Sequence, residues 1–316
     1  MSRAVLITGA AGFLGSNLCD YYLKNGDTVI GLDNLSTGLA QNLVHLKDDK
    51  KFSFVECDIV KNLSAEVTDQ KYDIIINMAS PASPPHYQRL GIETLQVGSV
   101  GTLRMLDLAK KNNARFFHAS TSEVYGDPEV HPQPETYKGS VNCYGPRSMY
   151  DESKRYAEAL IYTHRKKYGT NTCVGRFFNT YGPRMDPKDG RVVSNFIVQA
   201  LQGKPLTIYG DGGQTRSFCY VDDLVRGIVA LIDSKESEPI NLGNPGEFTI
   251  KELAEIVIKK IKNGSKLTYF PLPGDDPLQR KPVIGLAQQK LDWEPTIKLE
   301  DGLDKTIEYF QSILAK

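Results

Sequence analysis

The segment VLITGAAGFLGSNL, residues 5–18, decides the fold class. Its first part is a short apolar run typical of a buried strand, and its last part has the spacing of an amphipathic helix. Between them lie Gly9, Gly12 and Gly15. Because glycine has no Cβ, the backbone can turn tightly and approach a pyrophosphate, whose charge then lies at the helix N-terminus. The arrangement predicts a strand, a phosphate-binding turn and a helix, although the glycines alone would also fit a plain strand-to-helix turn.

The end of the next apolar run indicates which dinucleotide would bind. VIGLD ends at Asp33, 18 residues after Gly15, where an acidic side chain can accept hydrogen bonds from the adenosine ribose hydroxyls. The same charge would repel a 2′-phosphate, so the sequence favours NAD over NADP. With Tyr150 and Lys154, which are discussed below, the expected cofactor residues are Gly9, Gly12, Phe13, Leu14, Gly15, Asp33, Asn34, Asp58, Ile59 and Ala79.

Apolar strands alternate with amphipathic stretches up to about residue 180. The strands are AVLIT, DTVIGL, KFSFVEC, DIIINMAS, ARFFHAS and NTCVGRFF. Such alternation predicts an α/β fold with a doubly wound parallel (Rossmann) sheet. Later, short strands lie among Pro- and Gly-rich loops, with helices near 192–202, 223–233, 250–262 and 301–314. We predict an NAD-binding domain at residues 1–180 plus about 218–243, and a smaller C-terminal α/β lobe at 181–217 and 244–316.

The composition favours small-molecule partners. The chain has 316 residues with 38 Lys or Arg and 38 Asp or Glu, so it lacks the basic surface expected of a nucleic-acid-binding protein. No apolar run reaches membrane-spanning length, and no secretory leader precedes the strand at residue 4. The five cysteines are scattered without a C-x-x-C pair, which is typical of reduced thiols and disfavours a zinc site. We expect a cytoplasmic protein with no metal and with no membrane or nucleic-acid partner.

The spacing Tyr-x-x-x-Lys occurs twice, as Tyr150/Lys154 and as Tyr162/Lys166. Residues four apart share one helix face, so an ammonium can stabilise a phenolate and lower the tyrosine pKa from its usual value of about 10. Tyr150 lies at the N-terminal end of its predicted helix, near the strand ends where the dinucleotide is expected. Tyr162 lies 12 residues further along and would point to the far end. We predict Tyr150 and Lys154 as catalytic residues, against the alternative of a surface pair.

The segment ASTSEVYGD, residues 119–127, brings three oxygen-bearing side chains to a strand end. Thr121, Ser122 and Glu123 follow an apolar run and precede a turn, and open α/β sheets bind their ligands at this edge. We predict that all three belong to the catalytic site. The residues alone leave the role of the Glu123 carboxylate open.

Together these motifs resemble the extended short-chain dehydrogenase/reductase superfamily, most closely its UDP-glucuronate decarboxylase (UDP-xylose synthase) family. The resemblance covers the chain from end to end. It rests on ASPASPPHYQ (79–88), STSEVYGDPEVHPQ (120–133), YDESK (150–154), RFFNTYGPRM (176–185), DGRVVSNFIVQALQGKPLTIYGDGGQTRSF (189–218), INLGNP (240–245) and DDPLQRKP (275–282).

The resemblance implies a reaction. In similar enzymes, bound NAD oxidises C4 of UDP-glucuronate, the resulting β-keto acid loses CO2, and reduction at C4 gives UDP-xylose with NAD restored. Similar 4-epimerases carry small residues after the catalytic Ser or Thr, and 4,6-dehydratases carry Asp-Glu, so Ser122-Glu123 fits neither. Arg280 would hold the carboxylate on C5, and Glu123 would act as a base, hold O3 or favour a distorted ring. The catalytic residues that the resemblance implies are Thr121, Ser122, Glu123, Tyr150, Lys154 and Arg280.

The resemblance also implies a nucleotide-sugar site in the smaller lobe. Arg191 and Arg216 would bind the diphosphate, with a surface charge as the alternative for Arg191, and apolar residues near Val192 would surround the uracil. The implied substrate residues are Pro85, Tyr87, Asn179, Arg191, Val192, Tyr209, Arg216 and Arg280. Gly98 stands where similar enzymes often carry Asn or Ser, so we expect a polar contact near the nicotinamide to be missing or replaced.

Other functions stay open at this point. A UDP-uronate or UDP-sugar 4-epimerase, or a 4,6-dehydratase, would begin with the same oxidation at C4. A non-catalytic dinucleotide-sensing protein is the alternative from another class, and the intact Thr121, Tyr150 and Lys154 argue against it. The resemblance further implies a homodimer through a four-helix bundle built from helices near 93–112 and 150–168. The sequence leaves open the nucleotide base, the fate of the 4-keto intermediate and the pathway that uses the product.

Overall fold

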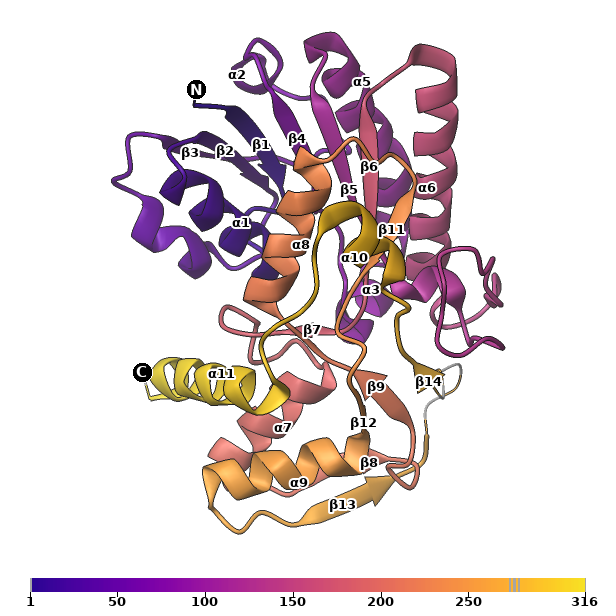
Figure 1. Ribbon diagram of the computed structural model, residues 1–316. Helices are drawn as coiled ribbons and strands as arrows, with labels where there is room; N and C mark the ends of the chain where they lie inside the picture. The colour runs from indigo at the N-terminus through magenta and orange to yellow at the C-terminus, as the bar shows by residue number, and fades with distance from the viewer. Residues whose placement is uncertain (1, 273, 275–276, 278, 316) are drawn as a thin grey trace.

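The computed structural model describes residues 2–272, 274, 277 and 279–315. Seven strands form one sheet in the order β11-β6-β5-β4-β1-β2-β3 (Figure 1), and all its strand pairs are parallel. The strands are β1 Ala4–Thr8, β2 Thr28–Asp33, β3 Phe52–Glu56, β4 Ile74–Asn77, β5 Arg115–Thr121, β6 Thr172–Phe177 and β11 Pro239–Leu242. This architecture confirms the predicted doubly wound parallel sheet.

Alternate residues of each central strand pack on opposite faces of the sheet. In β1, Val5 and Ile7 belong to one apolar cluster and Leu6 belongs to the other, as the two-residue period of a strand requires. Helices cover both faces, which explains why these strands are apolar along their whole length. One face carries α1 Phe13–Lys24 and α8 Val221–Asp233, and the other carries η2 Val97–Gly101, α5 Thr102–Asn112 and α6 Ser148–Tyr168. Helix α4 Gly91–Gln96 packs against α6.

The strand order reverses at β1. The chain passes from β1 to β2 and β3 on one side, and β4 then lies on the other side of β1. In open α/β sheets, ligands bind at the carboxyl ends of the strands beside such a reversal. Thr8, Asn77 and Thr121 end β1, β4 and β5 and therefore mark this edge.

The smaller lobe lies beneath the sheet in Figure 1. Within the described residues three small sheets accompany the large one: β7 pairs with β10 where the chain enters and leaves this lobe, β8 pairs with β13, and β9 lies between β12 and β14. Their bounds are β7 Thr180–Tyr181, β8 Leu206–Tyr209, β9 Thr215–Ser217, β10 Cys219–Tyr220, β12 Glu247–Thr249, β13 Leu267–Phe270 and β14 Gln279–Arg280. The lobe's helices are α7 Val192–Leu201, α9 Ile250–Ile261 and α11 Leu299–Leu314.

The remaining helices are short, namely η1 Ala40–Leu46, α2 Ala65–Thr68, α3 Pro84–Arg89, η3 Ser122–Tyr125 and α10 Gly285–Leu291. After the first part of the smaller lobe, α8 and β11 return the chain to the large sheet. The division into residues 1–180 with 218–243 and the rest stays a prediction. Within the described residues, no helix has both the length and the apolar character needed to cross a bilayer.

Candidate active site

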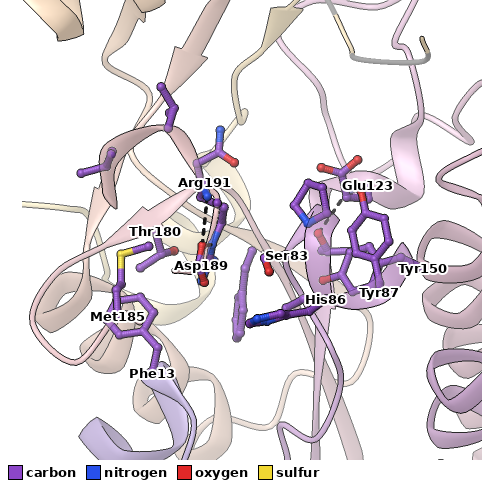
Figure 2. A pocket seen from close by; sticks show the side chains of 18 of the residues that line it. Phe13, Ser83, His86, Tyr87, Glu123, Tyr150, Thr180, Met185, Asp189 and Arg191 are labelled. Carbon is purple, nitrogen blue, oxygen red and sulfur yellow. Dashed lines mark hydrogen bonds and ion pairs between the residues drawn. The ribbon is translucent and has the colours of Figure 1, made fainter. Parts of the chain in front are cut away.

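A cavity of about 540 Å³ brings together the strand ends, the glycine turn and the smaller lobe. Figure 2 shows Tyr150, Tyr87 and Glu123 at one end of this cavity and Phe13 and Met185 at the other. The predicted residues that line it are Gly9, Gly12, Phe13, Leu14, Gly15, Pro85, Tyr87, Thr121, Ser122, Glu123, Tyr150, Lys154, Asn179, Arg191, Val192, Tyr209, Arg216 and Arg280.

The turn after β1 is shaped for an anion. Gly9 has a φ of +68°, in the left-handed region that favours glycine, and a Cβ on Gly15 would overlap the carbonyl oxygen of Gly9. The 12-residue helix α1 begins at Phe13, and its N-cap is Gly12, which has no side chain to cap it. The first backbone N–H groups of α1 can therefore bind a phosphate. These residues fit the pyrophosphate of NAD.

Five predicted cofactor residues lie outside the lining of the cavity, namely Asp33, Asn34, Asp58, Ile59 and Ala79. Asp33 accepts hydrogen bonds from the backbone N–H groups of Ala11 at 3.0 Å and Leu35 at 2.8 Å, so it ties the glycine turn to the end of β2. Burial raises the pKa of Asp33. Ile59 is buried in the apolar cluster on the α5 face of the sheet. The assignment of these five residues to the cofactor stays a prediction.

Helix α6 places Tyr150 and Lys154 at the strand ends. Both are buried, and Lys154 Nζ donates to the carbonyl oxygen of Ala119 at 2.8 Å and lies 5.7 Å from the centroid of the Tyr150 ring. Tyr87 stacks on Tyr150, with centroids 5.0 Å apart and planes 9° apart. Thr121 Oγ1 accepts a hydrogen bond from the backbone N–H of Glu123 at 3.2 Å, and the Thr121 side chain lies close enough to Tyr150 to act against the rise in the Tyr150 pKa. The structure therefore brings the predicted Thr121, Tyr150 and Lys154 together.

The pKa of Tyr150 differs from the expectation. Burial and the negative charge of Glu123 raise the pKa of Tyr150 to about 12, so Lys154 does not bring it towards neutrality in this structure. Burial also lowers the pKa of Lys154 to about 8. The expectation considered only the spacing along one helix, whereas the structure adds the burial of both side chains and a neighbouring carboxylate.

Glu123 lies between two arginines. Its Oε1 is 2.6 Å from Arg280 Nη1, and its Oε2 accepts a hydrogen bond from Arg147 Nη2 at 2.7 Å. The side chain of Arg280 is 2% exposed and that of Arg147 is 15% exposed. Burial alone would raise the pKa of Glu123, but the two guanidinium groups outweigh it and lower this pKa to about 2. A carboxylate that stays ionised at such a low pH is a weak base near neutrality, so the role of a base fits Glu123 least.

Arg280 is engaged differently from the expectation. Besides Glu123, its guanidinium donates to Ser122 Oγ at 3.2 Å and to the carbonyl oxygen of Gly126 at 2.7 Å. Its Nε is buried and has no hydrogen-bond partner among the described residues. The guanidinium that we expected to hold a substrate carboxylate is therefore already paired with Glu123 and Gly126, and its Nε–H is a buried donor that is still open to a ligand.

Arg147 was missed in the sequence. It follows a Gly-Pro pair and immediately precedes α6, and the sequence analysis did not single it out. Its position three residues before Tyr150 was the available signal. In the structure it lines the cavity and meets Glu123.

Arg191 is held by a neighbouring carboxylate that the sequence analysis did not single out. Its Nε and Nη2 donate to the two carboxylate oxygens of Asp189 at 2.5 and 2.7 Å, and both side chains line the cavity (Figure 2). Arg191 also lies close enough to Tyr150 for its charge to act against the rise in the Tyr150 pKa. Arg191 is therefore part of the cavity wall rather than an isolated surface charge.

Arg216 and Arg280 are neighbours across a strand pair. β14 runs parallel to β9 with Arg280 opposite Arg216, and both residues are buried. Residues that lie opposite each other in a sheet project from the same face. The small sheet thus presents both guanidinium groups to the same cavity. Of the segment DDPLQRKP, residues Asp275, Asp276 and Leu278 lie outside the described residues.

Gly98 has a packing role instead of the expected place near the nicotinamide. It lies in η2 and outside the lining of the cavity, and a Cβ on it would be 2.7 Å from Ser153 Cβ and 2.8 Å from the Ser153 carbonyl oxygen. A side chain at this position would therefore push on α6, next to Lys154. At the far end of α6, Tyr162 is 55% exposed and Lys166 Nζ lies 5.6 Å from its ring centroid, so this second pair is away from the cavity.

Comparisons with known proteins agree with this geometry. The sequence profile of the NAD dependent epimerase/dehydratase family matches residues 5–243. UDP-glucuronic acid decarboxylase 1 of Xenopus tropicalis is 50% identical over 312 residues, which are 99% of this chain and 73% of that protein. UDP-glucuronic acid decarboxylase 1 of Arabidopsis thaliana is 49% identical over 308 residues, which are 98% of this chain and 70% of that protein.

Solved structures are similar over nearly the whole chain. UDP-glucose 4-epimerase of Thermotoga maritima, solved with UDP-glucose, is 30% identical with a TM-score of 0.90, over 98% of this chain and 99% of that one. UDP-glucuronic acid 4-epimerase of Bacillus cereus, solved with UDP-glucuronic acid and NAD, is 29% identical with a TM-score of 0.88, over 98% and 99%. The glycine turn, the Tyr150/Lys154 pair and these likenesses agree, and the chain belongs to the NAD dependent epimerase/dehydratase family.

Proposed function

We propose that this protein is an NAD-dependent decarboxylase that converts UDP-glucuronate to UDP-xylose through a C4-keto intermediate. The observation that carries the proposal is the Glu123 carboxylate held between Arg280 and Arg147, beside Tyr150. Oxidation at C4 needs a base and a cofactor, whereas a buried guanidinium with an unpaired N–H in the same cavity is suited to a substrate with a carboxylate of its own. The similarity to the UDP-glucuronic acid decarboxylases supports this reading.

The glycine turn would hold the cofactor. Gly9, Gly12 and Gly15 line the cavity, and the N-terminus of α1 would receive the pyrophosphate. When bound, NAD would accept hydride from C4 of the sugar and return it after CO2 has left, and its positively charged nicotinamide would favour the phenolate of Tyr150.

Tyr150 and Thr121 would act on the oxygen at C4. Tyr150 would remove the O4 proton as C4 becomes a carbonyl, and its hydroxyl would then donate to the carbonyl oxygen. When the bond between C5 and the carboxylate breaks, its electron pair moves into that carbonyl and forms an enolate. Hydrogen bonds from Tyr150 and Thr121 would stabilise the enolate because negative charge develops there in the transition state. C5 would then take up a proton from water, and Tyr150 would return the proton that it took from O4.

Arg280 Nε would bind the substrate carboxylate. This N–H is buried and has no partner among the described residues, which costs about 1–3 kcal/mol when no ligand accepts from it. Glu123 would stay ionised and hold both arginines in place, as its pKa of about 2 requires. Arg191 and Arg216, on the smaller-lobe side of the cavity, would bind the diphosphate.

Incubation with NAD and UDP-glucuronate labelled with 13C throughout the sugar tests the proposal. Release of 13CO2 and the appearance of a five-carbon UDP-sugar with the xylo configuration in the NMR spectrum are the expected result. A product that keeps all six carbons, with or without inversion at C4, would contradict the decarboxylase and favour an epimerase.

A matched pair of variants separates chemistry from folding in the same assay. Tyr150→Phe should abolish CO2 release, because no other group takes the O4 proton. Tyr162→Phe makes the same substitution on the same helix at an exposed position and should retain wild-type turnover. Equal activity of the two variants would count against the role of Tyr150.

We further propose a homodimer through a four-helix bundle. Each subunit would contribute two segments, the first made of α4, η2 and α5 and the second made of α6. Ile92, Leu95 and Leu103 on the first segment, and Tyr156 on α6, expose apolar side chains that a second copy would cover. Sedimentation or light scattering should give twice the chain mass, and a monomeric mass would contradict this assembly. A cytoplasmic location stays a prediction.

A further inference from the structure

Three polar residues of the family-like segments have no place in the proposed reaction. Tyr125 and Gln133 belong to STSEVYGDPEVHPQ, and Asn241 belongs to INLGNP. None of the three lines the cavity, yet all are completely buried. Buried polar side chains are costly unless they are hydrogen-bonded, so their partners indicate what they do.

Their hydrogen bonds begin on the helix that carries Lys154. Glu158 lies one helical turn after Lys154, and its Oε1 accepts a hydrogen bond from Ser120 Oγ at 2.5 Å. Its two oxygens also accept from Arg176 Nε at 2.9 Å and Nη2 at 2.7 Å. Arg176 Nη1 then donates to the Tyr125 hydroxyl at 3.0 Å.

The hydrogen bonds continue to the segment that follows Arg280. The Tyr125 hydroxyl donates to Asn241 Oδ1 at 2.7 Å, and Asn241 Nδ2 donates to the carbonyl oxygens of Gln133 at 3.0 Å and Val283 at 3.1 Å. Gln133 Oε1 accepts from the backbone N–H of Lys281 at 2.8 Å, and the Gln133 backbone N–H donates to the Lys281 carbonyl oxygen at 2.8 Å.

This connection matters because β14 is only two residues long. Its ladder fixes Arg280 to β9 of the smaller lobe, whereas Tyr150 and Lys154 lie on α6, which packs against the large sheet. A two-residue strand is a weak anchor for a buried guanidinium that must reach across to Glu123. The bonds through Asn241 and Gln133 attach the chain immediately after Arg280 to β11 of the large sheet.

We propose that Tyr125, Asn241 and Gln133 are positioning residues that set Arg280 against Tyr150, and so give the site its preference for a sugar with a carboxylate on C5. They touch neither substrate nor cofactor, and they act through the backbone of residues 281–283. The identity of the sugar acid rests on the proposed function. The placement of Arg280 relative to α6 is independent of that function, because it follows from the hydrogen bonds of residues 281–283.

The test compares two substitutions of the same kind. Tyr125→Phe keeps the ring and removes the hydroxyl that joins Arg176 to Asn241. Tyr137→Phe is the matched control, because its ring stacks on Tyr125 with centroids 6.0 Å apart, while its own hydroxyl accepts a hydrogen bond from the exposed Glu129 N–H, outside the series of bonds that leads to Arg280. Both substitutions are made in a Tyr150→Phe background, in which UDP-glucuronate is not consumed, and the proteins are titrated, with NAD present, against UDP-glucuronate and against UDP-glucose, which lacks the carboxylate.

A positioning role predicts a ligand-dependent effect. Tyr125→Phe leaves the buried Asn241 Oδ1 without its donor. The free-energy cost of such an unpaired acceptor corresponds to roughly a 10-fold change in a dissociation constant. Tyr125→Phe should therefore weaken UDP-glucuronate binding about 10-fold and change UDP-glucose binding less than about 2-fold. Tyr137→Phe should change neither. Equal weakening of both ligands by Tyr125→Phe, or no change in either, would overturn the proposal.

A second variant keeps the test decisive if Tyr125→Phe does not fold. Gln133→Met retains the length of the side chain and removes the acceptor for the Lys281 N–H, and the same selective loss of uronate affinity is expected. The CO2 assay on the wild-type protein tests the proposed function separately from the positioning role. Wild-type protein that prefers UDP-glucuronate over UDP-glucose but releases no CO2 would overturn the decarboxylase and leave the positioning role to be decided by the two titrations.

Discussion

Replacing Glu123 by Gln tests the electrostatics of the strand end. Glu123→Gln keeps the size of the side chain and removes the negative charge between Arg280 and Arg147. Both arginines then keep positive charges in a largely buried place. Removing one partner of a buried ion pair is strongly destabilising because it leaves an uncompensated charge, at a cost of about 3–5 kcal/mol.

The loss should lie near the lower end of that range. Arg280 keeps its hydrogen bonds to Ser122 and to the carbonyl oxygen of Gly126, which disperse part of its charge. A loss of about 3 kcal/mol in the free energy of unfolding corresponds to a melting temperature lowered by roughly 4–5 °C in a chain of this size.

The pH dependence follows from the lowered pKa of Glu123. The carboxylate contributes its stability above the ordinary pKa of 4.5, and this contribution is lost as the pH falls towards about 2. The difference between wild type and Glu123→Gln should therefore be full at pH 7 and narrow below pH 4.5.

Urea unfolding and thermal melts of both proteins at pH 7 measure the effect. Glu152→Gln is the control, because Glu152 meets Arg155 in an exposed pair at 3.7 Å, and such pairs contribute about 0–1 kcal/mol. A Glu123→Gln melting temperature within about 1 °C of wild type at pH 7 would refute the reasoning that Glu123 neutralises two buried charges.

Three further changes have defined outcomes. Lys154→Met should abolish turnover and raise the melting temperature at pH 7, because it removes a buried charge whose pKa is lowered to about 8 by burial. The stability of the wild-type protein should rise with pH between 8 and 10.5, and the variant should lack that rise. Gly98→Ala should cost about 1–3 kcal/mol in urea unfolding because its Cβ would press on Ser153, while Gly285→Ala, with nothing near its Cβ, should cost far less. Asp151→Asn should raise the melting temperature at pH 8 and leave it unchanged at pH 3. Burial and Glu123 raise the pKa of Asp151 to about 7, so the wild-type protein loses stability as the pH rises from 3.8 through 7 and this carboxyl ionises. A variant that melts like wild type at pH 8 would contradict this.

The sheet could be predicted because its determinants are local. Val5, Leu6 and Ile7 are all apolar, which marks a strand buried on both faces, and Gly9 and Gly15 lie where the turn needs them. Thr121 and Tyr150 could be placed for the same reason, since a strand end and a helix start have fixed positions relative to the sheet.

The ion pairs could not be predicted in the same way. Whether Asp189 meets Arg191, or Glu123 meets Arg147, depends on the paths of loops that only the complete fold sets. The pKa of Tyr150 depends on burial and on Glu123, which belongs to another element. Spacing along a helix carries no information on either. Gly98 shows the same limit, because its neighbour Ser153 lies on a different helix.

The pairing of Arg216 with Arg280 relates the positions of two guanidinium groups in the cavity. Adjacent strands lie about 4.8 Å apart, so backbone hydrogen bonds between β9 and β14 set the separation of the two residues. In the proposed reaction one guanidinium would meet the diphosphate and the other the carboxylate, at opposite ends of one sugar ring. The site would then select a nucleotide sugar by the distance between its diphosphate and its carboxylate. A displacement of β9 would therefore move both contacts at once, whereas the bonds of residues 281–283 to Gln133 and Asn241 act on the Arg280 contact alone.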